Sequence, residues 1–160
     1  MKTPTLQWHK TFIQMTIILA QRSRCTKHQV ACIITNDRRP IITGINGTPP
    51  GYLNCDEKFY NIPSNTKSQD YQLYADEHHQ WSKHNEQHAE QNAIAFAAKL
   101  GISTLNTTAY LTMTPCLDCA KLLAVSGIQE LHYYQTYQRY PTQGIEFLES
   151  NNIPCLQTSP

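Results

Sequence analysis

Two short segments, each at the start of a predicted helix, constrain the fold of this chain more than any other feature. The first is His88-Ala89-Glu90, and the second is Pro115-Cys116-Leu117-Asp118-Cys119, which directly follows a predicted strand. Gly101 and Gly127 end the two helices, because glycine adopts the left-handed conformation that often closes a helix. The patterns predict helices over Ala89–Leu100 and Leu117–Ser126 and a strand over Thr107–Met113.

The other segments alternate between helical and extended patterns. Apolar residues at spacings of three and four predict a helix over Thr5–Arg22, and the turn residues 37–40 separate two strands of a hairpin. Strands are predicted over Val30–Thr35, Ile41–Gly44 and Gln129–Tyr134, and a last short helix over Pro141–Ser150. This alternation predicts an α/β fold with a single sheet and helices on both faces.

The segment from Tyr52 to Gln87 is the least regular part of the chain. It is polar, rich in Asn, Ser and His, and shows little periodicity, although it contains several aromatic residues. We interpret it as an insertion at about 52–87 within one domain spanning residues 1–160. A chain of this length can bury one proper core, and no internal repeat points to a second domain.

Charge and hydropathy limit the partners that this chain can bind. The sequence has 13 basic and 12 acidic residues and no basic run, which argues against a polynucleotide substrate but allows a single nucleotide. The apolar stretch Phe12–Ala20 is interrupted by Gln14 and Thr16, so neither a signal peptide nor a membrane span is predicted. We expect a cytoplasmic protein whose six cysteines serve as metal ligands or buried thiols.

The two helix starts carry the side chains that zinc prefers. Cys116 and Cys119 are three residues apart, which places both sulfur atoms on one face of a helical turn, and the positive end of the helix favours their thiolate forms. His88 at the neighbouring helix start can supply a third ligand. Three protein ligands leave the fourth zinc position for water, as in catalytic zinc sites.

Glu90 then lies close to the metal but is not needed as a ligand. Zinc lowers the pKa of its bound water to about 7, so hydroxide is available at neutral pH. Glu90 can accept the water proton, deliver it to N3 of a cytosine ring while hydroxide attacks C4, and then protonate the departing amine. An H-x-E segment followed by P-C-x-x-C is the pattern of zinc deaminases, in which the Glu is the acid and base.

Other interpretations than a catalytic zinc site exist for the cysteine pair. A C-x-x-C segment alone also occurs in redox pairs and in structural zinc sites, and the chain could be a non-catalytic zinc-binding module. A structural site, however, would need a fourth Cys or His ligand with matched spacing. The upstream H-x-E segment, the two helix starts and Pro115 together favour the catalytic interpretation.

At this point the sequence resembles the deoxycytidylate (dCMP) deaminase family, particularly its bacteriophage members, within the zinc-dependent cytidine deaminase superfamily. The resemblance covers roughly Thr11 to Tyr137. Its motifs are Ser23-Arg24-Cys25, Thr43-Gly44-Ile45-Asn46-Gly47-Thr48-Pro49, Asn54-Cys55-Asp56, Trp81-Ser82-Lys83, the segment from His88 to Ile94, the segment from Thr114 to Gly127, and the segment from Tyr133 to Tyr137.

The resemblance implies a cytidine-deaminase-like three-layer sandwich, in which a five-stranded mixed sheet carries helices on both faces. It implies hydrolysis of dCMP to dUMP and ammonia, supplying dUMP for thymidylate synthesis. Family members are usually homohexamers that dCTP activates and dTTP inhibits, so a homo-oligomer is expected. Mg²⁺ is a candidate companion of a nucleoside triphosphate effector.

The resemblance also implies roles for residues outside the zinc motifs. It suggests that Asn46 and Tyr137 contact the nucleotide, although turn geometry or packing would also explain these two residues. Arg22, Arg24 and Lys27 are candidates for the phosphate, although a solvated surface explains any one of them more simply. Cys25, Cys55 and either His78 or His79 fall where phage members hold a second, structural zinc. We interpret Cys32 and Cys155 as structural.

Two residues depart from the family pattern. Ile45 stands where an aromatic residue is common, and Lys99 stands where an Arg linked to allosteric control is expected. Whether dCTP and dTTP regulate this chain, and whether dCTP is itself a substrate, therefore stays open. A tRNA adenosine deaminase or a free-base deaminase shares both zinc motifs and is the alternative enzyme class, which the insertion and the near-neutral charge oppose.

Overall fold

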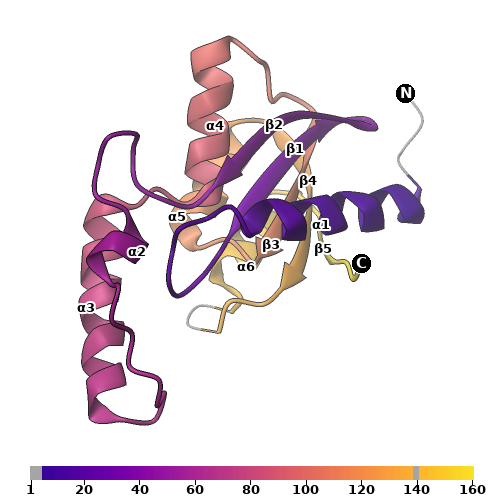
Figure 1. The fold of residues 1–160 in the computed structure, drawn as a ribbon. Coiled ribbons are helices and arrows are strands. Elements are labelled where there is room, and N and C mark those ends of the chain that lie inside the picture. Colours follow the sequence, from indigo (N-terminus) through magenta and orange to yellow (C-terminus); the bar gives the residue numbers. More distant parts are fainter. Residues whose placement is uncertain (1–4, 139–140) are drawn as a thin grey trace.

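The computed structural model describes residues 5–138 and 141–160, which form a five-stranded mixed sheet between two layers of helices (Figure 1). The strands lie in the order β2-β1-β3-β4-β5. Their bounds are β1 Ala31–Asn36, β2 Arg39–Ile45, β3 Thr107–Met113, β4 Ile128–Gln135 and β5 Cys155–Gln157. Strand β1 is antiparallel to β2 and β3, whereas β4 runs parallel to β3 and β5.

The helices cover both faces of the sheet, as the α/β prediction requires. Helix α1 (Leu6–Ala20) packs on one face, where Phe12 and Ile13 meet Ile33 and Tyr110. Helices α4 (Ala89–Leu100), α5 (Leu117–Val125) and α6 (Gln143–Ser150) pack on the other face, over the larger core that includes Ile34, Leu111 and Leu131. This arrangement is the predicted three-layer sandwich.

Most sequence-predicted elements agree with the observed ones within a few residues. Helix α4 has the predicted bounds and ends at Gly101, whose φ of 67° is left-handed. Pro40 lies inside β2, which is possible because β2 is an edge strand and a proline there removes no inner ladder hydrogen bond. Strand β5 was not identified from the residues themselves, since its three residues give too short a pattern.

The predicted irregularity of the insertion was wrong for about half of its length. The segment contains the short helix α2 (Cys55–Lys58) and the 17-residue helix α3 (Gln69–Asn85), which lie to one side of the sandwich (Figure 1). Ser68 caps α3 by accepting a hydrogen bond from the Tyr71 backbone N–H. Only Tyr74, Ala75 and His78 of α3 are buried, so the helix lacks the apolar stripe that would have revealed it.

The described residues include no helix that is both long and apolar enough to cross a membrane.

Candidate active site

His88, Cys116 and Cys119 converge where α4 and α5 begin. His88 and Cys116 are the N-cap residues of these two helices, and Cys119 lies in the first turn of α5. The Nδ1 atom of His88 is 3.5 Å from the Cys116 sulfur and 3.3 Å from the Cys119 sulfur. In a tetrahedral zinc site with bonds of about 2.0 Å to nitrogen and about 2.3 Å to sulfur, ligand atoms lie roughly 3.5 Å apart. The three side chains therefore fit one zinc ion.

The charge of this cluster also suits a cation. A hydrogen bond with Cys119, and a second with His88, lowers the pKa of the Cys116 thiol to about 4. The neighbouring Cys116 and burial raise the pKa of Cys119 in turn. Cys116 thus loses its proton more readily than Cys119, and a bound divalent cation would stabilise both as thiolates.

Glu90 lies one residue into α4 after Ala89 and is only 4% exposed. Its carboxyl group is within hydrogen-bonding reach of the Cys119 thiol, and burial raises its pKa. A buried carboxyl group beside a metal-type cluster, with a pKa displaced towards neutrality, is suited to accept and release a proton.

Two glycines allow neighbouring elements to approach this cluster closely. A Cβ atom on Gly44 of β2 would overlap the carbonyl oxygen of Ala89, and one on Gly144 of α6 would overlap that of Pro115. Asn92 of α4 also donates a 2.6 Å hydrogen bond to the carbonyl oxygen of Ile45. These contacts place both helix starts, and sequence reasoning had assigned no role to either glycine.

Asn46 connects three segments beside the helix starts. Its Oδ1 atom accepts hydrogen bonds from the Ser23 hydroxyl (2.6 Å) and the Val30 backbone N–H (2.9 Å). Its Nδ2 atom donates to the carbonyl oxygen of His28 at 2.8 Å. The ring of Tyr137 packs edge-on against the His28 ring, at 5.5 Å between centroids. His28, which the sequence did not single out, thus lies between the two residues expected to contact the nucleotide.

The candidate phosphate residues have different surroundings. Arg24 pairs with Asp56 and Glu57, each at 2.9 Å. An open cavity of about 600 Å³ follows α1, and Arg22, Arg24 and Lys27 all line it. Because Arg24 is already paired with two carboxylates, it is the least suited of the three to a nucleotide phosphate.

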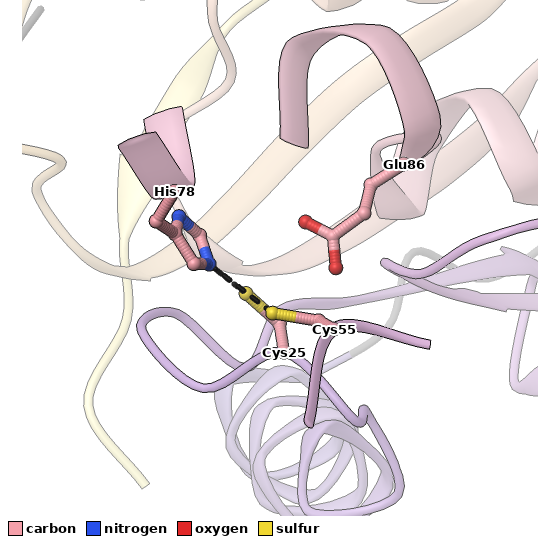
Figure 2. A group of neighbouring side chains, drawn as sticks. All are labelled: Cys25, Cys55, His78 and Glu86. Atoms are coloured by element: carbon pink, nitrogen blue, oxygen red, sulfur yellow. Dashed lines mark hydrogen bonds between the residues drawn. The ribbon is translucent and has the colours of Figure 1, made fainter. Parts of the chain in front are cut away.

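A second cluster combines Cys25, Cys55, His78 and Glu86 (Figure 2). The His78 Nε2 atom is 3.5 Å from the Cys25 sulfur and 3.3 Å from the Cys55 sulfur. The structure brings His78, not its neighbour His79, to the thiols. Glu86 was missed because it follows α3 and reaches the cluster through extended backbone, which leaves no spacing signal.

This second cluster also has the features of a metal site. All four ligand atoms lie within 4.8 Å of one another. The Oε2 atom of Glu86 accepts from the Ser82 hydroxyl at 2.6 Å, while its buried Oε1 atom has no hydrogen-bond partner within the described chain. Such an orphan oxygen is costly unless a cation binds it. Hydrogen bonds with Cys25 and His78 lower the pKa of Cys55.

The remaining residues singled out from the sequence lie outside both clusters. Lys99 is exposed in the last turn of α4, at the opposite end from His88. Cys32 is fully buried in the sheet, and Cys155 is half-buried in β5, where burial raises the pKa of its thiol to about 12. Neither thiol belongs to a metal-type cluster among the described residues.

This fold and the site at the starts of α4 and α5 define a zinc-dependent deaminase. The chain belongs to the cytidine and deoxycytidylate deaminase family, whose zinc-binding region matches residues 6–135.

Individual relatives agree with this assignment. The chain is 38% identical to the deoxycytidylate deaminase of Enterobacteria phage T2, with 81% of this chain and 80% of the relative covered. The enzyme of phage T4 is 36% identical, over 81% and 78% of the two chains. The crystal structure of the cyanophage S-TIM5 dCMP deaminase in complex with dCMP and dUMP has the same fold, with a TM-score of 0.75, 23% identity, and 96% and 98% of the two chains covered.

Proposed function

We propose that this chain hydrolyses dCMP to dUMP and ammonia, and so supplies dUMP for thymidylate synthesis. One observation carries the proposal: three zinc-type ligands, His88, Cys116 and Cys119, converge beside the buried carboxyl group of Glu90. The names of the phage relatives, and the dCMP and dUMP bound to a protein of the same fold, support this choice of nucleotide.

In this mechanism His88, Cys116 and Cys119 would hold a zinc ion, which would act as a Lewis acid and make water nucleophilic at neutral pH. Glu90 takes the proton of the attacking water on its carboxylate. It passes this proton to N3 of the cytosine ring, which makes C4 more electrophilic. Glu90 then takes the remaining proton from the new C4 hydroxyl group and gives it to the amine, so that ammonia leaves and the C4 carbonyl of dUMP forms. The burial that raises the pKa of Glu90 favours its holding of each proton between uptake and delivery.

Nucleotide binding is assigned to the neighbouring loops. Asn46 uses three of its side-chain hydrogen-bonding positions within the protein, which orients its amide group and leaves one N–H of Nδ2 for the sugar. Tyr137 lies across His28 from Asn46 and would contact the sugar as well. Arg22 and Lys27 at the open cavity are the cations best suited to the single phosphate.

We assign a second, structural zinc to Cys25, Cys55, His78 and Glu86, because thiolate and imidazole ligands suit zinc and the Glu86 oxygen lacks another partner. It would connect α2 and α3 to the loop after α1 within a single domain. The proposal also includes regulation by dCTP and dTTP with Mg²⁺, to which Lys99 would contribute. It further includes a homo-oligomer, with a hexamer favoured, and a cytoplasmic location.

A side-by-side assay tests the function. Purified protein is incubated with dCMP, dCTP, cytidine and a tRNA anticodon stem, and ammonia release is measured. We expect dCMP to be turned over with the highest kcat/KM. Preference for dCTP would move the assignment to a triphosphate deaminase, and turnover of the tRNA alone would overturn it.

A further inference from the structure

Three consecutive residues connect the two clusters. Glu86 belongs to the second cluster and His88 to the first, and only Gln87 lies between them. The backbone of Gln87 pairs with Gly47 as an isolated antiparallel bridge, with N–H to O distances of 2.9 and 3.1 Å. Gly47 directly follows Asn46, so the backbone on one side of Asn46 is attached to the segment that joins both clusters.

A second connection reaches Asn46 from the side of Cys25. The backbone N–H of Cys25 donates to the Ser23 hydroxyl oxygen at 3.2 Å. That hydroxyl lies 2.6 Å from Oδ1 and 3.0 Å from the backbone oxygen of Asn46, both of which can accept its proton. Ser23 thus connects Cys25, a ligand of the second cluster, to the Oδ1 atom and the backbone oxygen of Asn46.

These groups are largely buried, although Ser23 and Cys25 also border the open cavity that follows α1. Ser23 is 3% exposed, and Asn46, Cys25 and Cys55 are buried as well. A hydrogen bond that Ser23 loses is therefore costly, so a displacement of Cys25 affects Asn46 through Ser23. The helices that carry His88, Cys116 and Cys119 are held mainly by the packing of α4 and α5 on the sheet, in addition to the short link through Gln87.

We propose that Ser23 is a positioning residue that couples the second metal cluster to Asn46, so that metal bound by Cys25 and Cys55 sets how tightly the nucleotide binds. This inference rests on the proposed function, because it takes Asn46 as a nucleotide contact. The second metal orders the loop after α1, Ser23 transmits that order, and Asn46 presents its remaining N–H in one orientation. The coupling acts on binding and leaves the proton transfers of Glu90 unchanged.

The first test removes the metal ligand Cys55 in the full-length protein. We expect Cys55→Ser to contain one zinc per chain where the wild type contains two. Its KM for dCMP should rise about tenfold, while kcat should stay within about twofold of the wild-type value. This pattern is expected when a residue that orients a binding group is lost. Cys155→Ser, a half-buried thiol in β5, is the matched control and should keep both metals and the wild-type KM.

The second test separates Ser23 from the metal. Ser23→Ala should keep two zinc ions and still raise KM about tenfold, with Ser126→Ala at the C-cap of α5 as the control. Combined with Cys55→Ser it should add little, whereas independent effects would multiply to about a hundredfold. Amide hydrogen exchange in peptides containing Val30 and Asn46 should accelerate in both single variants, because their hydrogen bonds depend on the Asn46 side chain and backbone.

The outcomes distinguish this inference from the proposed function. The coupling would be overturned if the wild type contains a single zinc. It would also be overturned if Cys55→Ser contains one zinc but keeps the wild-type KM and exchange rates, or if Ser23→Ala changes neither KM nor exchange. If Cys55→Ser does not fold, Ser23→Ala decides by itself. If the wild type does not deaminate dCMP, the proposed function fails, and the zinc counts and exchange rates still decide whether the coupling exists.

Discussion

Gly44 in β2 lies so close to the first turn of α4 that a Cβ atom there would overlap the carbonyl oxygen of Ala89 and lie 2.6 Å from the backbone nitrogen of Ala93. Both obstacles are helix backbone, which cannot rotate away as a flexible side chain can. The contact therefore places His88 and Glu90, which flank Ala89, at a fixed depth against the sheet.

Gly44→Ala is expected to push the start of α4 away from β2. Overpacking of this kind costs about 1–3 kcal/mol of unfolding free energy. Activity should fall further than stability, because both His88 and Glu90 move with the helix start. Urea unfolding and dCMP turnover measure the two effects. Thr43→Ala, at an exposed position of the same strand, is the control, and a Gly44→Ala enzyme with full activity would contradict this role of the contact.

Glu90→Gln is expected to abolish deamination while both zinc ions stay bound. The amide has nearly the same shape but cannot accept a proton, and loss of such a group typically costs about 10²–10⁴ in rate. Zinc content by atomic absorption and single-turnover rates provide the comparison. Glu146→Gln on the exposed face of α6 should leave the rate unchanged. Unchanged activity of Glu90→Gln would refute the catalytic role and favour a purely structural zinc module.

The two clusters should release zinc at different rates. His88 is exposed and Cys116 half-buried, whereas Cys25, Cys55 and His78 are all buried. A chelator should therefore remove the zinc of the first cluster faster, and activity should disappear with this fast phase. A colorimetric zinc indicator and parallel activity samples follow the process. Re-addition of Zn²⁺ should restore turnover and Mg²⁺ should not, because thiolate and imidazole ligands disfavour magnesium. If activity survives the fast phase, the zinc bound by His88, Cys116 and Cys119 is not the catalytic one.

Glu130 lies in β4, outside both clusters, and should make the free energy of unfolding depend on pH. Its carboxylate lies 3.3 Å from Nε2 of the buried His132, and this contact lowers the pKa of Glu130. A carboxyl group with a lowered pKa in the folded state stabilises the protein above its unfolded pKa. This contribution is lost as the pH falls through the folded value.

Glu130→Gln is accordingly expected to lower the unfolding free energy by about 1 kcal/mol at pH 7. The difference from the wild type should shrink as the pH approaches about 4, where the wild-type carboxyl group begins to take up its proton. Urea denaturation of both proteins across this range measures it, and comparison at each pH cancels any common loss of zinc. Glu149→Gln, on the exposed part of α6, serves as the control. A difference that grows towards acidic pH would have the wrong sign.

Local patterns were sufficient for the first cluster and for most of the sheet. Cys116 and Cys119 lie one helical turn apart, and His88 and Glu90 lie within three residues of each other, so their relation depends on helix geometry alone. The glycine that ends α4 and the β-branched run of β3 are likewise local signals. The sequence therefore predicted that His88, Cys116 and Cys119 lie together, and it predicted the helix starts that carry them.

The tertiary structure alone decided what depends on contacts between distant segments. Helix α3 has no apolar stripe because it packs through a small aromatic cluster, and Glu86 reaches Cys25 and Cys55 only once α2, α3 and the loop after α1 meet. The close approach of Gly44 to Ala89 and the position of Ser23 between Cys25 and Asn46 arise in the same way. Such contacts are set by packing across the chain, which no spacing of residues within one segment encodes.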